Sequence, residues 1–174
     1  MKEIAGYQAP QNALSTQIAY AAGLRAHELA TLEKAELRPA DERPALEDKF
    51  SYRDGEKYTV VGKGGLCREV LIPKNLSEQL ENRRLETPQM VTDRGIHYEK
   101  NYNIGVGRAF SQSFSRASEA QLDWSHGAHG LRHSYAQERM DELRDNGAER
   151  NHALEVVSQE LGHFRPEITE TYLR

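Results

Sequence analysis

Apolar residues recur at helical spacing near the start of the chain. Residues Leu14, Ile18, Ala21 and Ala22 predict a helix from Gln11 to Ala22, which Gly23 interrupts. The next apolar positions, Leu29, Leu32 and Leu37, predict a second helix from Arg25 to Leu37. Two prolines, Pro39 and Pro44, then indicate a loop.

Short runs rich in β-branched and aromatic residues follow this loop. They predict strands over residues 50–52, 57–61 and 69–72, with turns at 54–55 and 62–65 where glycines lie. Such strands form a small antiparallel sheet. Pro73 ends it, and Asn75 is placed to cap a helix that runs to about Leu85.

The second half of the chain has an almost continuous helical pattern. Helices are predicted over 102–118 and 130–146, and a third follows with Leu154, Val157 and Leu161 on one face, ended by Gly162. A last short helix is predicted to start after Pro166 and to contain Tyr172. The pattern as a whole predicts a mostly helical α+β fold with a three-stranded antiparallel sheet at one edge.

Composition narrows the class of protein. The chain has 174 residues, 37% of them hydrophobic and 29% charged, which is typical of a soluble globular domain. No apolar run approaches the length that spans a bilayer, and no secretory signal precedes the first helix. Cys67 is the only cysteine, so an internal disulfide is impossible and a cytoplasmic setting is expected. The net charge of −4 argues mildly against a nucleic-acid partner, although a site can be locally basic.

Five short segments carry chemistry-bearing residues in a fixed order. They are Gly23-Leu24-Arg25, Lys63 within the Gly62–Gly65 turn, His129-Gly130-Leu131-Arg132-His133, Leu161-Gly162-His163, and Tyr172. Each segment by itself is weak, but the ordered set is much more specific. Together they resemble the tyrosine recombinase (phage integrase) family, and the resemblance covers the chain from about Ala19 to Tyr172.

The resemblance implies a DNA recombinase or integrase domain that cleaves and rejoins strands through a 3′-phosphotyrosine, with neither metal nor ATP. Arg25 and Arg132 would clamp the scissile phosphate, since the guanidinium fork matches phosphate oxygens. Lys63 would protonate the leaving oxygen. The resemblance further implies that His129 takes the proton of Tyr172, the nucleophile, and that His163 binds a phosphate oxygen.

The same resemblance implies partners and organisation. The expected partners are double-stranded DNA and other protomers in a DNA-bound synaptic tetramer, with a monomer in the absence of DNA and no membrane. A bacterial host, nucleoid association and a mobile genetic element also follow from the family. Residues 1–174 are expected to form one catalytic domain, lacking the N-terminal core-binding domain and with a truncated C-terminal tail, because Arg25 lies so early and Tyr172 so late.

Several alternatives remain open at this stage. Lys57 is a second candidate for the lysine role. The spacing of His126, His129 and His133 suggests a metal site, but the absence of a His-Glu-x-x-His motif disfavours it. No metal or other cofactor is therefore expected. Ser134 lacks the Gly-x-Ser-x-Gly context of a hydrolase nucleophile. A type IB topoisomerase-like enzyme and a catalytically inactive DNA-binding remnant or regulator are the competing functions.

Overall fold

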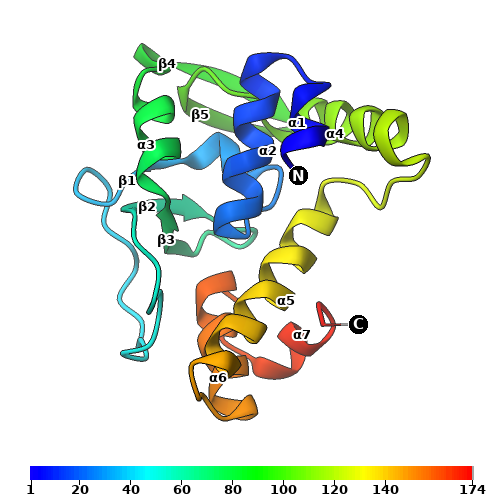
Figure 1. Cartoon of the computed structure of the whole chain (residues 1–174). Helices are drawn as coiled ribbons and strands as arrows, with labels where there is room; N and C mark the ends of the chain where they lie inside the picture. The colour runs from blue at the N-terminus through cyan, green and yellow to red at the C-terminus, as the bar shows by residue number, and fades with distance from the viewer. Residues whose placement is uncertain (174) are drawn as a thin grey trace.

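A computed structural model describes residues 1–173, which form helices around two small sheets (Figure 1). The helices are α1 (Lys2–Gly6), α2 (Pro10–Ala22), α3 (Lys74–Glu81), α4 (Gly107–Leu122), α5 (His129–Asp145), α6 (Arg150–Leu161) and α7 (Pro166–Glu170). The 3-10 turn η1 (Glu28–Thr31) and the strands β1 (Glu33–Lys34), β2 (Glu56–Val61), β3 (Cys67–Ile72), β4 (Arg84–Asp93) and β5 (Ile96–Tyr102) complete the chain. The predicted α+β class is confirmed. No helix within residues 1–173 has the length and apolar character that crossing a membrane requires.

The three-stranded antiparallel sheet is present in the order β1-β2-β3, but β1 takes the place of the predicted strand 50–52. The segment 50–52 is a turn in which Phe50 and Tyr52 have φ angles of 63° and 64°. These left-handed values exclude a strand. The Phe50 amide instead donates to Glu160 Oε1 at 2.8 Å. The edge position is filled by β1, where Glu33 pairs with Thr59.

The predicted helix from Arg25 to Leu37 is wrong. Gly23 closes α2 at a φ of 64°, and the chain then makes only the η1 turn before it enters β1. The polar groups here bond across the fold: Thr31 Oγ1 accepts the amide hydrogen of Val61 at 2.9 Å. Leu29 within this turn and Leu32 directly after it are buried, whereas Leu37 is exposed, so the three leucines do not share one helical face and tertiary packing determined the local structure.

A long hairpin of β4 and β5 occupies the stretch between two predicted helices, for which the sequence predicted no element. The helix expected to reach Leu85 ends at Glu81, and the helix expected from Tyr102 begins at Gly107. Most side chains of the hairpin are exposed, so hydrophobic alternation gave no strand signal. Its turn has φ angles of 50° at Arg94 and 78° at Gly95, the left-handed pair that suits a two-residue hairpin turn.

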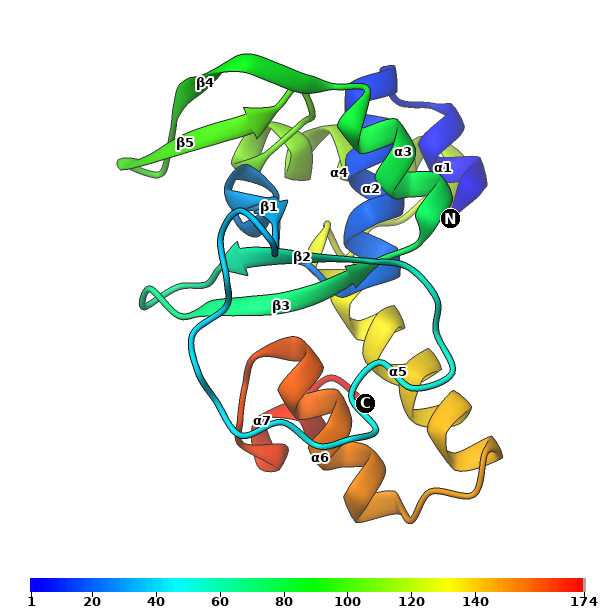
Figure 2. The same ribbon diagram turned by 90° about the vertical axis from the view of Figure 1, so that its left-hand side faces the viewer.

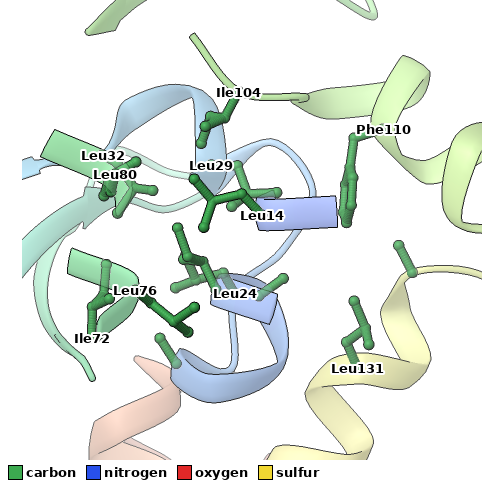
Figure 3. Close-up of a cluster of buried hydrophobic side chains, with 14 of the residues drawn as sticks. Leu14, Leu24, Leu29, Leu32, Ile72, Leu76, Leu80, Ile104, Phe110 and Leu131 are labelled. Atoms are coloured by element: carbon green, nitrogen blue, oxygen red, sulfur yellow. The ribbon is translucent and has the colours of Figure 1, made fainter. Parts of the chain in front are cut away.

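Two clusters of buried side chains hold the fold together. The first is formed largely by α2, η1, the three-stranded sheet and α4, and Figure 3 shows Leu14, Leu29 and Phe110 converging there. The second joins α5 and α6, and Tyr172 and Leu173 pack against it. Helix α5 links the two, because Leu131 belongs to the first cluster and Tyr135 to the second. This leaves the start of α5 at the junction, where the predicted site residues lie.

A strap without helix or strand, residues 35–55, crosses α6 (Figure 2). Its Leu46 amide donates to Gln159 Oε1 at 2.8 Å, and its Asp48 lies 2.7 Å from His152 Nε2. Earlier in the strap, Arg43 lies over the ring of Phe164, 5.7 Å from its centroid. The strap thereby fixes α6 and the loop that follows it.

Candidate functional site

Five of the six predicted site residues come together where α2, α5 and α6 meet. Arg25 follows α2, His129 and Arg132 lie in the first turns of α5, His163 follows α6, and Tyr172 follows α7. His163 Nε2 lies 3.0 Å from Arg132 Nη2 and 3.4 Å from Arg25 Nη2. The sixth residue, Lys63, lies apart from this group, in the turn between β2 and β3.

Gly23 sets the direction in which Arg25 leaves α2. Its φ of 64° is left-handed, and a Cβ at this position would lie 2.8 Å from a ring carbon of Tyr135. Both facts favour glycine. The turn leaves Arg25 Nη1 3.3 Å from Glu28 Oε1, and the Arg25 amide donates to Glu28 Oε2 at 2.8 Å. Glu28 therefore holds both the backbone and the side chain of this arginine.

Glu28 lies at the centre of a buried ionic cluster. Its side chain is fully buried and accepts a 2.8 Å hydrogen bond from Arg68 Nη2, and Arg132 Nη1 lies 3.9 Å away. Burial by itself raises the pKa of this carboxyl, but Arg68 and Arg132 outweigh that effect and lower the pKa to about 2. The residue is thus ionised throughout the neutral range.

Arg68 is a member of the cluster that sequence reasoning missed. It lies on β3, its side chain is 3% exposed, and its Nη1 donates to the carbonyl of Glu160 at 2.6 Å. A Cβ at Gly162 would overlap the Cδ atom of Arg68, so the glycine before His163 makes room for this side chain. The only sequence signal was a charged residue within a strand, which by itself indicates an exposed position.

Arg132 is completely buried in this structure. Nη1 donates to the carbonyl of Gly23 at 2.5 Å and Nη2 to the carbonyl of Leu161 and to His163, whereas Nε has no partner among the described residues. Burial, together with the nearby Arg68, lowers the pKa of Arg132 to about 9, which leaves the guanidinium protonated at neutral pH.

Positive charge exceeds negative charge in this cluster. Arg25, Arg68 and Arg132 all lie within 4 Å of one carboxylate, that of Glu28. The nearest other buried carboxylate, Glu160, is already bound by Arg139 at 3.0 Å and by the Tyr135 hydroxyl at 2.7 Å. An uncompensated buried charge is costly, so the cluster is suited to receive an anion.

His163 has a defined protonation state here. Arginine can only donate, so Nε2 accepts from Arg25 and Arg132 and must carry a lone pair. The proton then lies on Nδ1, which donates to Thr169 Oγ1 at 2.9 Å. Burial, followed by the charges of Arg132 and Arg25, lowers the pKa of His163 to about 3. The ring is neutral at physiological pH.

This shift predicts a pH dependence of stability. An unfolded His163 would titrate near 6.5 and the folded one near 3, so between these values the unfolded chain binds the extra proton. The contribution of His163 to the stability of the fold should therefore be fully present above about pH 6.5 and be lost as the pH is lowered. We expect the melting temperature to fall between pH 7 and pH 5, with His163 accounting for roughly 2–4 °C of the fall after allowance for its partial exposure.

Differential scanning fluorimetry of His163→Gln tests this expectation. The variant should show a shallower decrease, although His27 and His129, whose pKa values burial also lowers, keep part of it. The matched control is His97→Gln, which replaces an exposed imidazole on β5 and should keep the wild-type slope. An identical slope in all three proteins would contradict the neutral assignment of His163.

Tyr172 lies beside three histidines. Its ring centroid is 4.6 Å from that of His133, 5.0 Å from His163 and 5.3 Å from His129. The Arg132 guanidinium lies over the same ring, 5.5 Å from its centroid. Tyr172 follows α7, which ends at Glu170, rather than lying inside that helix as predicted.

The pKa of His129 is lowered by burial and, after it, by His133, Arg132 and Arg25. This shift favours a neutral imidazole that is able to accept a proton.

Lys63 lies apart from this cluster, exposed in the glycine turn between β2 and β3. It lines an open groove of about 960 Å³ that also includes His27, the residue two positions after Arg25. The alternative, Lys57, is engaged within the sheet, 3.2 Å from Glu69. Lys63 thus differs from Lys57 in having no ion pair within residues 1–173, and its role in the site stays a prediction.

Metal ligands do not gather in the described part of the chain. Residues 1–173 contain no group of three His, Cys, Asp or Glu side chains placed to hold a metal ion. His126, one of the three histidines considered for a metal, packs against Trp124 with 4.9 Å between the ring centroids.

Comparisons with known proteins give a fold but no close relative. No protein-family model matches the sequence, and a search of curated proteins finds no significant match. Among solved structures, the post-cleavage complex of the XerH site-specific recombinase with a palindromic difH substrate is similar at 20% identity with a TM-score of 0.57, covering 94% of this chain and 41% of that chain. The Tn1549 transposon integrase in complex with circular intermediate DNA is similar at 12% identity with a TM-score of 0.50, covering 95% of this chain and 54% of that chain. The chain thus spans about half or less of these proteins.

Proposed function

We propose that this chain, which has the fold of a tyrosine recombinase catalytic domain, cleaves and rejoins DNA strands through Tyr172. The observation that carries the proposal is the surplus of buried guanidinium charge around Arg132, directly beside the ring of a tyrosine. The chemistry needs both parts, an anion site and a nucleophile, within reach of each other.

The scissile phosphate is the proposed anion. Its non-bridging oxygens would take the hydrogen bonds that Arg25 and Arg132 now give to His163. Once released, His163 Nε2 can take up a proton and donate to a phosphate oxygen. Negative charge on these oxygens grows in the pentacovalent transition state, so the arginines stabilise that state more than the bound substrate.

Tyr172 is the proposed nucleophile. Its oxygen forms a bond to phosphorus while the bond from phosphorus to the 5′ oxygen breaks, and the phenol proton passes to His129. Lys63 supplies the proton that the leaving 5′ oxygen takes up. The 3′-phosphotyrosine keeps the energy of the broken bond, so attack by a 5′ hydroxyl reverses each step without ATP and restores the tyrosine.

One rearrangement must precede this chemistry. The Tyr172 ring and His163 cover Arg132, whose side chain is fully buried. A phosphate can reach the guanidinium only after the ring turns aside, and rotation of the Tyr172 side chain would provide that movement. Lys63 must likewise approach from its turn, where Gly62, Gly64 and Gly65 permit backbone rotation.

Partners follow from the same proposal. The solved neighbours described above were crystallised with DNA substrates. We propose double-stranded DNA as the partner of this chain too, and assembly with further protomers on that DNA. Residues 1–174 would act as the catalytic domain in that assembly, which would carry out integration or another DNA strand exchange.

Covalent capture tests the proposed nucleophile. The substrate is a pool of duplexes with randomised central sequences, each nicked so that the cleaved end diffuses away and religation fails. We expect the wild-type chain to form an adduct that survives denaturing gel electrophoresis and maps to Tyr172 by peptide mass spectrometry. Tyr172→Phe, which removes one oxygen and keeps the ring, should reduce the adduct at least a thousandfold.

Tyr135→Phe is the matched control, because Tyr135 is a buried tyrosine of the cluster against which Tyr172 packs, and its hydroxyl bonds Glu160. It should lower thermal stability and keep the adduct. An adduct that persists in Tyr172→Phe, or a wild-type chain that binds the DNA pool and never forms one, would remove Tyr172 from the mechanism.

A further inference from the structure

The two hairpins of the fold form the walls of the large groove that contains Lys63. One wall is the Gly62–Gly65 turn between β2 and β3, and the other is the end of the β4–β5 hairpin, residues 93–99. Both hairpins project toward the same side of the molecule (Figure 2). The β4–β5 hairpin has no role in the mechanism proposed above.

Each wall carries a cation near its tip. Lys63 lies on one turn and Arg94 on the other, and both are exposed. Neither forms an ion pair with any carboxylate of residues 1–173. Two of the acids in the groove are already engaged: Asp93 accepts the amide hydrogen of Arg108 at 2.8 Å, and Glu33 is bound by Arg84 at 2.8 Å. Glu99, on β5, is the remaining exposed acid of the lining.

The floor of the groove, between the two hairpins, contains a histidine with a ring nitrogen that makes no hydrogen bond within residues 1–173. His27 lines the groove, and its Nε2 is buried with no hydrogen-bond partner in the described chain. Buried polar atoms are nearly always paired, so this nitrogen is available to a polar group that enters the groove. The other buried unpaired nitrogen is Nε of Arg132, in the proposed phosphate site. The groove and that site are joined through Arg25, two residues before His27.

The β4–β5 hairpin is fixed to the body of the protein. Asp93 lies at the first turn of α4, where Gly107 has a φ of 57° and a Cβ would lie 2.6 Å from the Asp93 carboxyl carbon. At the other end of the hairpin, Arg84 forms an ion pair with Glu33 of β1, and the side-chain Nδ2 of Asn101 donates to the carbonyl of Leu32 at 3.3 Å. The hairpin thus holds Arg94 at a set position opposite Lys63.

We propose that this groove holds the sugar–phosphate backbone of the DNA next to the scissile phosphate, with Arg94 on the β4–β5 hairpin as a phosphate contact. The inference rests on the proposed function and extends it to a hairpin that the reaction itself does not use. Unpaired cations on facing walls match the charge of a phosphate backbone. Exposed Leu37 and Ile96, which also line the groove, suit the apolar edges of the sugars.

Salt-dependent binding tests the inference. Fluorescence anisotropy with a labelled duplex, at several salt concentrations, gives the slope of log affinity against log salt. Arg94→Gln should reduce that slope by about 0.9, the value for one phosphate contact, which corresponds to a loss of affinity of roughly eightfold at 0.1 M salt. Arg94→Lys keeps the charge and should retain most of the wild-type slope.

Arg144→Gln is the matched control, since Arg144 is an exposed arginine near the far end of α5, away from both hairpins (Figure 1). It should bind DNA as the wild type does, and all three variants should melt at the wild-type temperature. If Arg94→Gln and Arg144→Gln bind equally well, the groove is not a DNA site.

Adduct formation separates this inference from the proposed function. A Tyr172 adduct together with unchanged binding by Arg94→Gln would overturn the groove and leave the nucleophile in place. Binding that depends on Arg94, with no adduct from the wild-type chain, would overturn the cleavage chemistry and leave the groove as a DNA-binding surface.

Discussion

Arg132→Lys is expected to slow strand cleavage by roughly a hundred- to a thousandfold. Loss of one preorganised donor to a developing oxyanion has an effect of this size. Lysine keeps the charge but lacks the planar fork, and the arginine here serves several acceptors at once: the carbonyls of Gly23 and Leu161, and His163. A single ammonium cannot hold these groups and bind phosphate in bidentate fashion. The rate of adduct formation under single-turnover conditions on the nicked duplex pool measures the effect.

Arg139→Lys provides the comparison that separates catalysis from stability. Arg139 is also a completely buried arginine of α5, but it bonds Glu160 and Glu142, and no contact joins it to Tyr172 or His163. It should lower the melting temperature and leave cleavage close to wild type once both proteins are folded. Equal cleavage rates for Arg132→Lys and wild type would show that Arg132 only supports the fold.

The resemblance to a known family located the site better than hydrophobic periodicity located the fold. The order of Arg25, Arg132, His163 and Tyr172 along the chain predicted a set of groups that the structure brings together, and their roles remain predictions. Helices with one apolar stripe, such as α2 and α6, were also predictable because each buries one face. Lys63 was placed correctly on a hairpin turn, while its contact with the other residues was not established.

Failures of prediction occurred where distant contacts determine the local structure. The segment after Arg25 reads as a helix by its leucines, but Glu28 is drawn to Arg68 on β3 and Thr31 to Val61 on β2. Sequence cannot show such pairs, because their members lie 30 and 40 residues apart. The exposed β4–β5 hairpin was not predicted for the opposite reason, because it buries too few side chains to produce an alternating hydrophobic pattern. Arg68 was missed because charged residues are seldom buried unless paired.

The contact between Glu28 and Arg68 leads to the second large expected effect. Glu28→Gln should destabilise the fold by about 3–5 kcal/mol, the usual cost of removing one partner from a buried ion pair. The amide keeps the shape but leaves Arg68, 3% exposed, and the fully buried Arg132 without the carboxylate that lies between them. Urea unfolding at pH 7 measures the change, and for a chain of this size the melting temperature should fall by roughly 10 °C.

The pH dependence of this difference identifies its cause. The pKa of Glu28 is about 2 in the folded protein against an ordinary 4.5, so its contribution is complete above about pH 4.5 and is lost as the pH falls toward 2. The gap between wild type and Glu28→Gln should therefore narrow in acid, as the wild-type carboxylate itself becomes protonated. Glu36→Gln, which removes an exposed partner of Lys34 at 3.8 Å, should change stability by less than about 1 kcal/mol. Similar small losses in both variants would mean that solvent, and not Glu28, neutralises the arginines, and the surplus charge proposed to bind phosphate would lose its basis.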